Sequence, residues 1–462
     1  MKKKAINVFM LTMINIATIL SIRNWPITAE YGLSAIPLLL LAMVFFFVPT
    51  AFVSAELASG WPEKGGIFAW ANEAMGPRIG MLAVWLLWVE NVVWYPIILS
   101  FLAASFAFVI NQSLATNQWY LFLMILGIFW TVTIANLQGM KISGWISTVG
   151  AIAGTILPGL LIICLGFLWL AMGYPSQISF SLDSLFPSLT NISQLAFLAG
   201  TLLSFCGMEM SAVHAKDVEN PTKNYPRAIF FSSCIIITLT ILGTLAIAIV
   251  TPKHDISLVA GGIEAIYLML HAFGLSFLVP VIAIFISIGA LAGVSSWVAG
   301  PCRGLLAASE KGDFPPFLQK VNKHGMPVNF MLLQGAIVSL LGSLFVFMPD
   351  VSSSFWILTV LAAQLYLIMY ILMFLAGVIL KYKRPNHKRP YHVPFGNIGM
   401  WTIASLGLIG SLFAIIVGFF PPEGIQTGGM ISFEIFLLIG IAIFCGTPLL
   451  IYQLRRPSWQ QS

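Results

Sequence analysis

Charged side chains are scarce in this sequence: Asp, Glu, Lys and Arg together supply 8% of its 462 residues, whereas 59% are hydrophobic. Ordinary soluble domains carry roughly 25% charged residues. A chain with this composition has too few polar side chains to cover a folded surface in water. The scarcity of charge therefore excludes a soluble fold and indicates an integral membrane protein.

Cysteine and histidine are also few and dispersed. The five cysteines all lie in apolar segments, and no pair has the spacing of metal ligands (Cys164, Cys206, Cys234, Cys302 and Cys445). The six histidines have no adjacent pair of carboxylates, so the sequence lacks the catalytic cluster that an integral-membrane enzyme needs. Rings of like charge, typical of an ion channel, are lacking too. We expect no metal and no cofactor.

Long apolar runs, by contrast, are abundant. A hydrocarbon core about 30 Å thick needs ~20 apolar residues per helix. The sequence predicts an all-α integral membrane fold of twelve transmembrane helices in one polytopic domain (1–462). The predicted spans are 5–22, 35–58, 79–110, 119–138, 146–172, 194–213, 228–250, 274–307, 328–348, 355–380, 398–420 and 431–453.

Basic residues fall on one side of these spans. Of the 22 Lys and Arg residues, all but Arg23 and Lys253 lie in alternate loops or at the two ends. Because cytoplasmic loops retain positive charge, both termini are predicted to be cytoplasmic, in the inner (plasma) membrane. The net charge of +6 then reflects loops beside anionic membrane lipid and implies no nucleic-acid partner.

Two predicted spans carry polar residues in matching places. In the first they precede Pro26, and in the sixth they include Gly207 and Glu209. Five spans separate the two, an odd shift that reverses the orientation of the second half. Paired interruptions indicate an inverted five-helix repeat (1–172 and 193–382, then two extra helices in 398–455), with substrate bound where both helices unwind. Two ordinary helices with polar spots are the alternative.

Several motifs resemble the amino acid–polyamine–organocation transporters. They are LSFCGMEMSA (203–212) with ENPTKNYPRA (219–228), FPPF (314–317) with VNKHGMPV (321–328), and GWPEKGGIFAW (60–70) with MGPR (75–78). Within that superfamily, SWVAGPCRG (296–304) and the spacing of Tyr366 and Tyr370 are most similar to the bacterial glutamate/γ-aminobutyrate antiporters.

The resemblance implies the leucine-transporter fold, two inverted five-helix repeats plus two extra helices, and alternating access without enzymatic chemistry. The partners would be an amino acid and the amino acid or amine exchanged for it. Proton- or sodium-coupled symport through the same fold is the alternative. The fifth span has no lysine around 150–157 that could replace sodium as a tethered cation, which favours exchange.

Two glutamates lie inside predicted spans. A charge at the bilayer midplane costs at least ~2.5–3.5 kcal/mol, so such a residue is retained where it lines a cavity or has a partner. Similar transporters couple protonation of a glutamate at the position of Glu209 to substrate movement; a purely structural hydrogen-bonded acid is the alternative. Glu90, next to Asn91, is either a second proton site or, the favoured reading, a tie between helices.

The predicted substrate contacts come from four helices. Unwound backbone can bind the ammonium and carboxylate groups of an amino acid; we expect it at Thr18, Ile19 and Ser21 in the first span and at Ser204, Phe205, Cys206, Gly207 and Met208 in the sixth. By resemblance, Trp297, Tyr366 and Tyr370 line the pocket. Ordinary packing aromatics are the alternative for these three.

Two positions depart from the resembled family. Gly293 stands where relatives can carry a glutamate, and Arg23 stands where they have a tyrosine three residues before the proline. Glutamate therefore cannot be assumed to be the substrate. Arg23 is a candidate partner for a substrate carboxylate, and a side chain that merely snorkels to lipid headgroups is the alternative.

Overall fold

A computed structural model describes residues 6–61, 66–139, 150, 152–186, 195–211, 218–309, 312–422 and 424–459. Apart from two isolated β-bridges, the regular structure of these residues is helical. The α-helices are α1 (Val8–Ile19), α2 (Trp25–Ala29), α3 (Ala35–Ala42), α4 (Val48–Gly60), α5 (Ile67–Met75), α6 (Pro77–Ile110), α7 (Gln118–Leu137), α9 (Leu157–Ala171), α10 (Phe197–Leu203), α11 (Met208–Ser211), α12 (Pro221–Val250), α13 (Gly261–Ala272), α14 (Val279–Ser309), α15 (Val328–Gly342), α16 (Leu344–Phe347), α17 (Val351–Lys383), α18 (Gly396–Val417) and α19 (Met430–Gln453).

Among these described residues, 10 helices are long and apolar enough to cross a membrane, and the bent pair Val8–Ile19 and Ile22–Ala29 brings the number to 11. These 11 segments coincide with eleven of the predicted spans. The remaining prediction, 194–213, corresponds to α10 and α11, two short helices separated by a break. The all-α membrane fold is confirmed, whereas the count of twelve remains a prediction.

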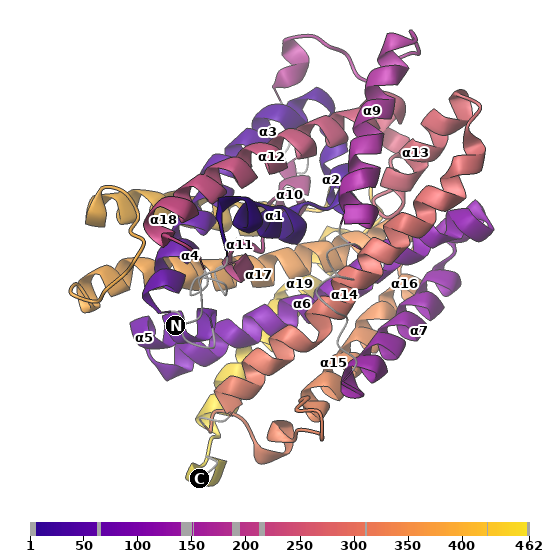
Figure 1. The fold of residues 1–462 in the computed structure, drawn as a ribbon. Coiled ribbons are helices and arrows are strands. Elements are labelled where there is room, and N and C mark those ends of the chain that lie inside the picture. Colours follow the sequence, from indigo (N-terminus) through magenta and orange to yellow (C-terminus); the bar gives the residue numbers. More distant parts are fainter. Residues whose placement is uncertain are drawn as a thin grey trace.

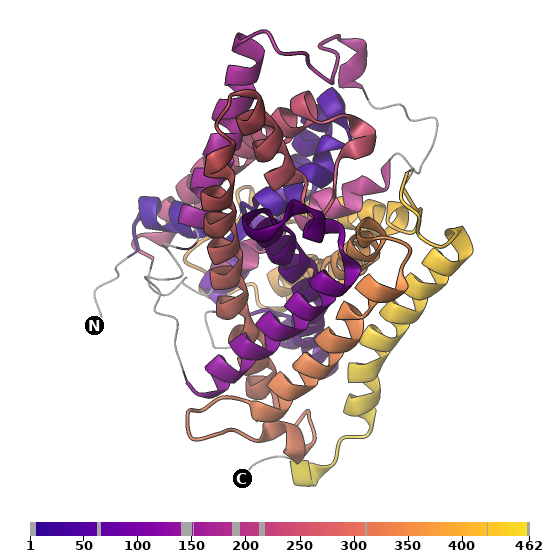
Figure 2. The ribbon, with the colours of Figure 1, turned by 90° about the vertical axis from the view of Figure 1, so that its right-hand side faces the viewer.

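Of the long apolar helices that the structure describes, α6 and α17 are the most deeply buried. α6 packs along both α14 and α17, and Figure 1 shows α6 and α14 crossing the bundle side by side. In Figure 2 the yellow helix, α19, lies at the outside of the bundle, where it contacts α6 and α17. Apolar side chains exposed on α19 and the other outer helices suit contact with lipid chains.

The first broken helix bends between α1 and α2. α1 ends at Ile19, Leu20 and Ser21 are extended, and a short 3₁₀ turn, η1 (Ile22–Asn24), leads into α2 with a bend of 42°. Pro26 stands in the first turn of α2, where its missing N–H breaks no helical hydrogen bond. The predicted unwinding at residues 18–21 is therefore shifted: Thr18 and Ile19 are still helical, and only Leu20 and Ser21 are extended.

The second break separates α10 from α11. α10 ends at Leu203 and α11 begins at Met208, so residues 204–207 form the link and Met208, predicted to be unwound, is helical. Gly207 has φ of +111°, a conformation that residues with a Cβ rarely adopt. The two breaks face each other, because a Cβ added to Gly207 would lie 3.3 Å from Cγ2 of Thr18.

The fifth span lies against α14 at a pair of glycines. A Cβ added to Gly154, in the π-helix η5 (Ile152–Ile156), would lie 2.3 Å from Cα of Gly289. A side chain as large as lysine at position 154 would therefore displace one helix from the other. This close approach explains by packing why a glycine stands at position 154, within the segment 150–157 where the sequence has no lysine.

A buried ion cluster joins α4 to the end of α17 and the loop that follows it. The carboxylate of Glu56 is 2.8 Å from Nζ of Lys381 and 2.8 Å from Nη1 of Arg389, and it also accepts the N–H of Val393 at 2.7 Å. All three charged side chains are buried. The cluster fixes the loop after α17 onto the C-terminal part of α4.

The short helix α13 lies over the bend of the first helix. Gly261 and Gly262 begin α13, and a Cβ added to Gly261 would lie 3.0 Å from the ring of Pro26. Ile263 and Ile266 are buried, whereas His271 on the opposite face is exposed, as the amphipathic pattern of this segment leads one to expect. α13 therefore covers the side of the first break that carries Pro26.

Two carboxyl groups near α13 predict how stability depends on pH. Burial raises the pKa of Glu30 from 4.5 to about 7, against the opposing charge of Lys253, and burial raises the pKa of Glu264 from 4.5 to about 7. The folded state then binds these protons more tightly than the unfolded state, so their contribution makes folding less favourable as the pH rises from about 4.5 to about 7.

Glu30→Gln and Glu264→Gln should therefore raise the melting temperature in detergent at about pH 8 and leave it near wild type at about pH 4.5, where the carboxyls are protonated in both states. Melting curves of the two variants at both pH values test this. An equal shift of the melting temperature at the two pH values would contradict it.

Candidate functional site

A cavity of about 90 Å³ lies where the two helix breaks meet. Its walls come from α1 and η1, from α6, from α10 and the link after it, and from α14 and α17. The lining residues are Thr18, Ile19, Ser21, Arg23, Asn24, Glu90, Asn91, Trp94, Leu203, Ser204, Cys206, Gly207, Trp297 and Tyr366.

The cavity brings together most of the residues that the sequence predicts for the site. Both broken helices contribute, and Trp297 and Tyr366 add one aromatic side chain each from α14 and α17. The predicted residues that line it are Thr18, Ile19, Ser21, Arg23, Glu90, Ser204, Cys206, Gly207, Trp297 and Tyr366. Phe205, Met208, Glu209 and Tyr370 are not among the lining residues.

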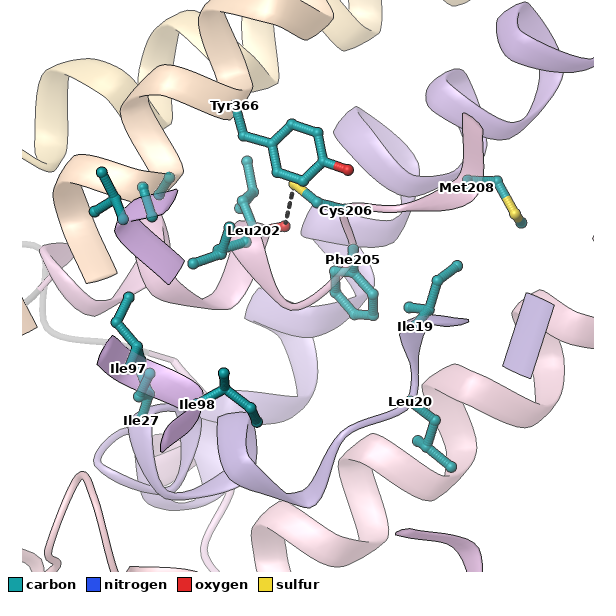
Figure 3. Packing of buried hydrophobic residues seen from close by; sticks show 14 of the residues in the cluster. Ile19, Leu20, Ile27, Ile97, Ile98, Leu202, Phe205, Cys206, Met208 and Tyr366 are labelled. Carbon is teal, nitrogen blue, oxygen red and sulfur yellow. Dashed lines mark hydrogen bonds between the residues drawn. The ribbon is translucent and has the colours of Figure 1, made fainter. Parts of the chain in front are cut away.

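Phe205 and Met208 are buried in packing instead. In the link between α10 and α11, Ser204 and Cys206 line the cavity, whereas Phe205 between them does not. Figure 3 shows Cys206 directed toward Tyr366 and Phe205 directed away from both. The ring of Phe205 lies 5.3 Å from that of Phe47. The predicted substrate contacts at these two positions concern the backbone rather than the side chains, and they stay a prediction.

Glu209 lies one layer behind the cavity wall. Tyr366 donates its hydroxyl proton to Oε1 of Glu209 at 2.5 Å, and Tyr370 donates to Oε2. The N–H of Gly207 donates to the hydroxyl oxygen of Tyr370 at 2.8 Å, and the two tyrosine rings stack at 4.9 Å. Tyr366 itself lines the cavity, so one hydroxyl connects the buried carboxyl to the space beside it.

Glu90 faces the cavity from α6. Nδ2 of Asn91 donates to Oε2 of Glu90 at 3.0 Å and to the carbonyl of Leu87 at 2.8 Å. In the described part of the chain, this side-chain hydrogen bond joins residues of one helix and ties α6 to no neighbour. The expectation that Glu90 ties two helices together therefore stays a prediction.

Arg23 is buried in the cavity wall. Arg23 is 4% exposed, and its Cζ lies 5.6 Å from the centre of the Trp94 ring. A side chain held this way does not reach lipid headgroups, so the snorkelling alternative is wrong. The position on η1, directly after the first break, directs the guanidinium inward.

Four lining residues were missed by sequence reasoning: Asn24, Asn91, Trp94 and Leu203. Trp94 lies four residues after Glu90 and therefore on the same face of α6. Its ring centre lies 6.5 Å from that of Trp297, so the two indoles form adjoining walls. The i, i+4 spacing from a buried glutamate was the available signal, but aromatic residues in membrane helices usually mark packing or the interface.

The arrangement offers binding chemistry. In the first link Leu20 and Ser21 are extended. In the second link the N–H groups of residues 204–207 already donate hydrogen bonds, so carbonyl groups are what this link offers to a ligand. These backbone groups lie beside a guanidinium, a carboxyl and two indoles. Within the described ranges, no group of three or more His, Cys, Asp or Glu residues could hold a metal ion. The cavity suits a small zwitterion.

Comparisons with known proteins agree with this geometry. Residues 6–444 match the amino acid permease family. An uncharacterized transporter of Legionella pneumophila is 40% identical over 446 residues, 96% of either chain. A glutamate/gamma-aminobutyrate antiporter of Lactococcus lactis is 32% identical over 461 residues, 98% of this chain and 92% of the relative. A probable agmatine/putrescine antiporter of the same species is 24% identical over 358 residues, 76% and 74% of the two chains.

The apolar helices, the cavity between two broken helices and these matches define a multi-pass membrane transporter. The chain belongs to the amino acid permease family, in the amino acid–polyamine–organocation superfamily, and is similar over nearly its whole length to a bacterial glutamate/gamma-aminobutyrate antiporter. The resemblance read from the sequence motifs is confirmed.

Proposed function

We propose that this protein is a secondary active antiporter that exchanges an amino acid for another amino acid or for an amine by alternating access. The observation that carries the proposal is the cavity at the meeting point of the two helix breaks. The names of the antiporters of Lactococcus lactis support exchange rather than another transport mode.

The substrate's shared groups would bind to the broken helices. The extended backbone at Leu20 and Ser21 and the carbonyl groups of the link at 204–207 would bind the ammonium and the carboxylate, without a charged side chain for either. Trp297 would close one side of the bound amino acid. Glu209, behind Tyr366, would take up and release a proton. Its protonation would alter the hydrogen bond made by the Tyr366 hydroxyl, which faces the substrate.

The architecture we propose completes the helices with a broken sixth span, 194–213, to give twelve spans. Repeats at 1–172 and 193–382 would have opposite orientations, with two extra helices in 398–455. The break in each repeat falls in its first helix, which supports this division. The distribution of Lys and Arg supports cytoplasmic termini in a bacterial inner membrane.

Exchange is favoured over symport by the fifth span. A tethered cation in place of sodium would need space near 150–157, and there Gly154 lies against Gly289. Without a driving ion held in this way, the empty transporter would change slowly between its outward-facing and inward-facing states. The substrate-loaded transporter would change between them quickly.

Counterflow in proteoliposomes tests the proposal. Vesicles preloaded with unlabelled amino acid should accumulate labelled amino acid rapidly, whereas empty vesicles should accumulate little. The reason is that the loaded carrier moves its binding site from one side of the membrane to the other faster than the empty carrier does. Protein-free vesicles are the control for leakage. Equal uptake into empty vesicles under an imposed proton or sodium gradient would instead establish symport, and no counterflow of any amino acid or amine would refute the transport assignment.

A further inference from the structure

The guanidinium of Arg23 is buried and has no hydrogen-bond or ion-pair partner among the residues that the structure describes. None of the described carboxylates lies within the 4.0 Å of an ion pair, none of the hydrogen bonds among described residues is donated by its side chain, and Nε is fully buried without an acceptor. A buried, unpaired charge is strongly unfavourable, so such groups in proteins are normally paired. The N–H groups of Arg23 therefore have no bonded acceptor among the described side chains.

The surroundings of Arg23 hold it toward the cavity. Its Cζ lies 5.6 Å from the ring centre of Trp94, a distance at which the aromatic face attracts a cation. Ser21 and Asn24, its neighbours on the first break, line the same cavity, and neither uses its side chain to cap the turns beside it. A planar guanidinium resting on an indole keeps its N–H groups available for an anion.

Glu90 is the charged side chain of the cavity that could compete for Arg23. It lines the same cavity from α6, the helix that also carries Trp94. Yet it makes no ion pair with Arg23, and its Oε2 instead accepts a hydrogen bond from Asn91 at 3.0 Å. The two charges attract each other across the cavity wall without a hydrogen bond between them, so the N–H groups of Arg23 stay available to a ligand.

We propose that Arg23 and Trp94 form a subsite for a second carboxylate of the substrate, the one on its side chain. The proposal rests on the proposed function, because it assumes that the zwitterionic end occupies the broken helices. A carboxylate can accept two N–H bonds from one guanidinium, an arrangement stronger than bonds between neutral groups. The transported class is then amino acids with an acidic side chain, and a cationic side chain is repelled.

Acid and amide pairs isolate this charge. Glutamate and glutamine, or aspartate and asparagine, differ by one oxygen against one NH₂ group and have nearly the same shape. Competition against labelled substrate in counterflow gives the affinity ratio of each pair. We expect wild type to bind the acid more tightly than the amide. Arg23→Gln should still exchange the amide but lose at least about ten-fold of the preference for the acid, which is the effect of one charge-assisted hydrogen bond.

Two variants control the result. Lys253→Gln removes an exposed positive charge that the sequence places on the same side of the membrane, so it should keep the acid preference if the effect is local. Arg23→Lys keeps the charge but loses the planar fork and should give an intermediate ratio. Thermal melting of the purified variants with acid or amide present reports binding without transport.

Equal affinity of wild type for acid and amide overturns the subsite, as does an acid preference that survives in a folded Arg23→Gln variant or disappears equally in Lys253→Gln. These results leave the proposed function intact, because counterflow of neutral or basic amino acids would still occur. Absence of all counterflow in wild type refutes the proposed function itself.

Discussion

Glu209→Gln is expected to abolish the pH dependence of exchange while the protein stays folded. In the structure both oxygens of Glu209 accept hydroxyl protons, from Tyr366 and from Tyr370. Protonation converts one acceptor oxygen into a donor, so one tyrosine must find another partner. Because Tyr366 lines the cavity, this rearrangement reaches the substrate site. A glutamine keeps an acceptor oxygen but cannot change its charge between pH values.

The measurement is the initial rate of counterflow between about pH 5 and pH 8. Tyr366→Phe is the matched variant: it keeps Glu209 but removes the hydroxyl that connects the carboxyl to the cavity, so it should weaken both binding and the response to pH, by the ~0.5–1.5 kcal/mol typical of one hydrogen bond for binding. If Glu209→Gln has the same pH profile as wild type, Glu209 is a structural residue and proton coupling lies elsewhere.

Glu56→Gln is expected to destabilise the protein by about 3–5 kcal/mol, the usual effect of removing one partner from a buried ion pair. Glu56 neutralises Lys381 and Arg389, whose side chains are 6% and 4% exposed. Without the carboxylate, two buried cations face each other uncompensated, and the N–H of Val393 loses its acceptor. The loop after α17 should then detach from α4.

Glu73→Gln provides the control. Glu73 also forms an ion pair, with Arg384 at 2.7 Å, but the two side chains are 31% and 55% exposed. An exposed pair contributes at most about 1 kcal/mol, so this variant should melt close to wild type. Denaturation of both variants in the same detergent compares them directly. Equal destabilisation by the two substitutions would show that the buried cluster has no special part in stability.

The sequence predicts the helices of this protein well because membrane burial imposes one simple rule. Every segment of about 20 apolar residues becomes a helix, since backbone groups have no water to bind in lipid. The ends of the span predicted at 119–138 therefore agree within a residue with α7. The exception, 194–213, is the span where polar residues and Gly207 interrupt the apolar run.

The helix breaks were predicted with unequal accuracy. Gly207 marks the second break because it supplies a positive φ that other residues avoid. The first break has no glycine, so its position was counted from Pro26, and the extended residues prove to be Leu20 and Ser21 rather than the whole of 18–21. The side chain of Phe205 points away from the cavity because the turn geometry of the link sets its direction, and composition does not encode that geometry.

Contacts between distant parts of the chain were the hardest to foresee. Nothing near Glu56 in the sequence indicates that Lys381 and Arg389 will be its partners, because the pairing depends on how α17 packs beside α4. Trp94 was missed for the same reason: its role beside Arg23 arises only when α6 meets the first break. Two side chains from separate helices acquire a joint function only through tertiary packing.

Chemical modification of Cys206 tests the central claim, that substrate binds where the two breaks meet. Cys206 lines the cavity from the second break and is not part of a disulfide. Cys206→Ser is the control, which should transport but resist a small methanethiosulfonate reagent. In wild type we predict that the reagent blocks counterflow, and that saturating amino acid substrate slows modification of Cys206 several-fold, as mass spectrometry of the labelled peptide will show. Modification of Cys206 at the same rate with and without a transported substrate would contradict the account.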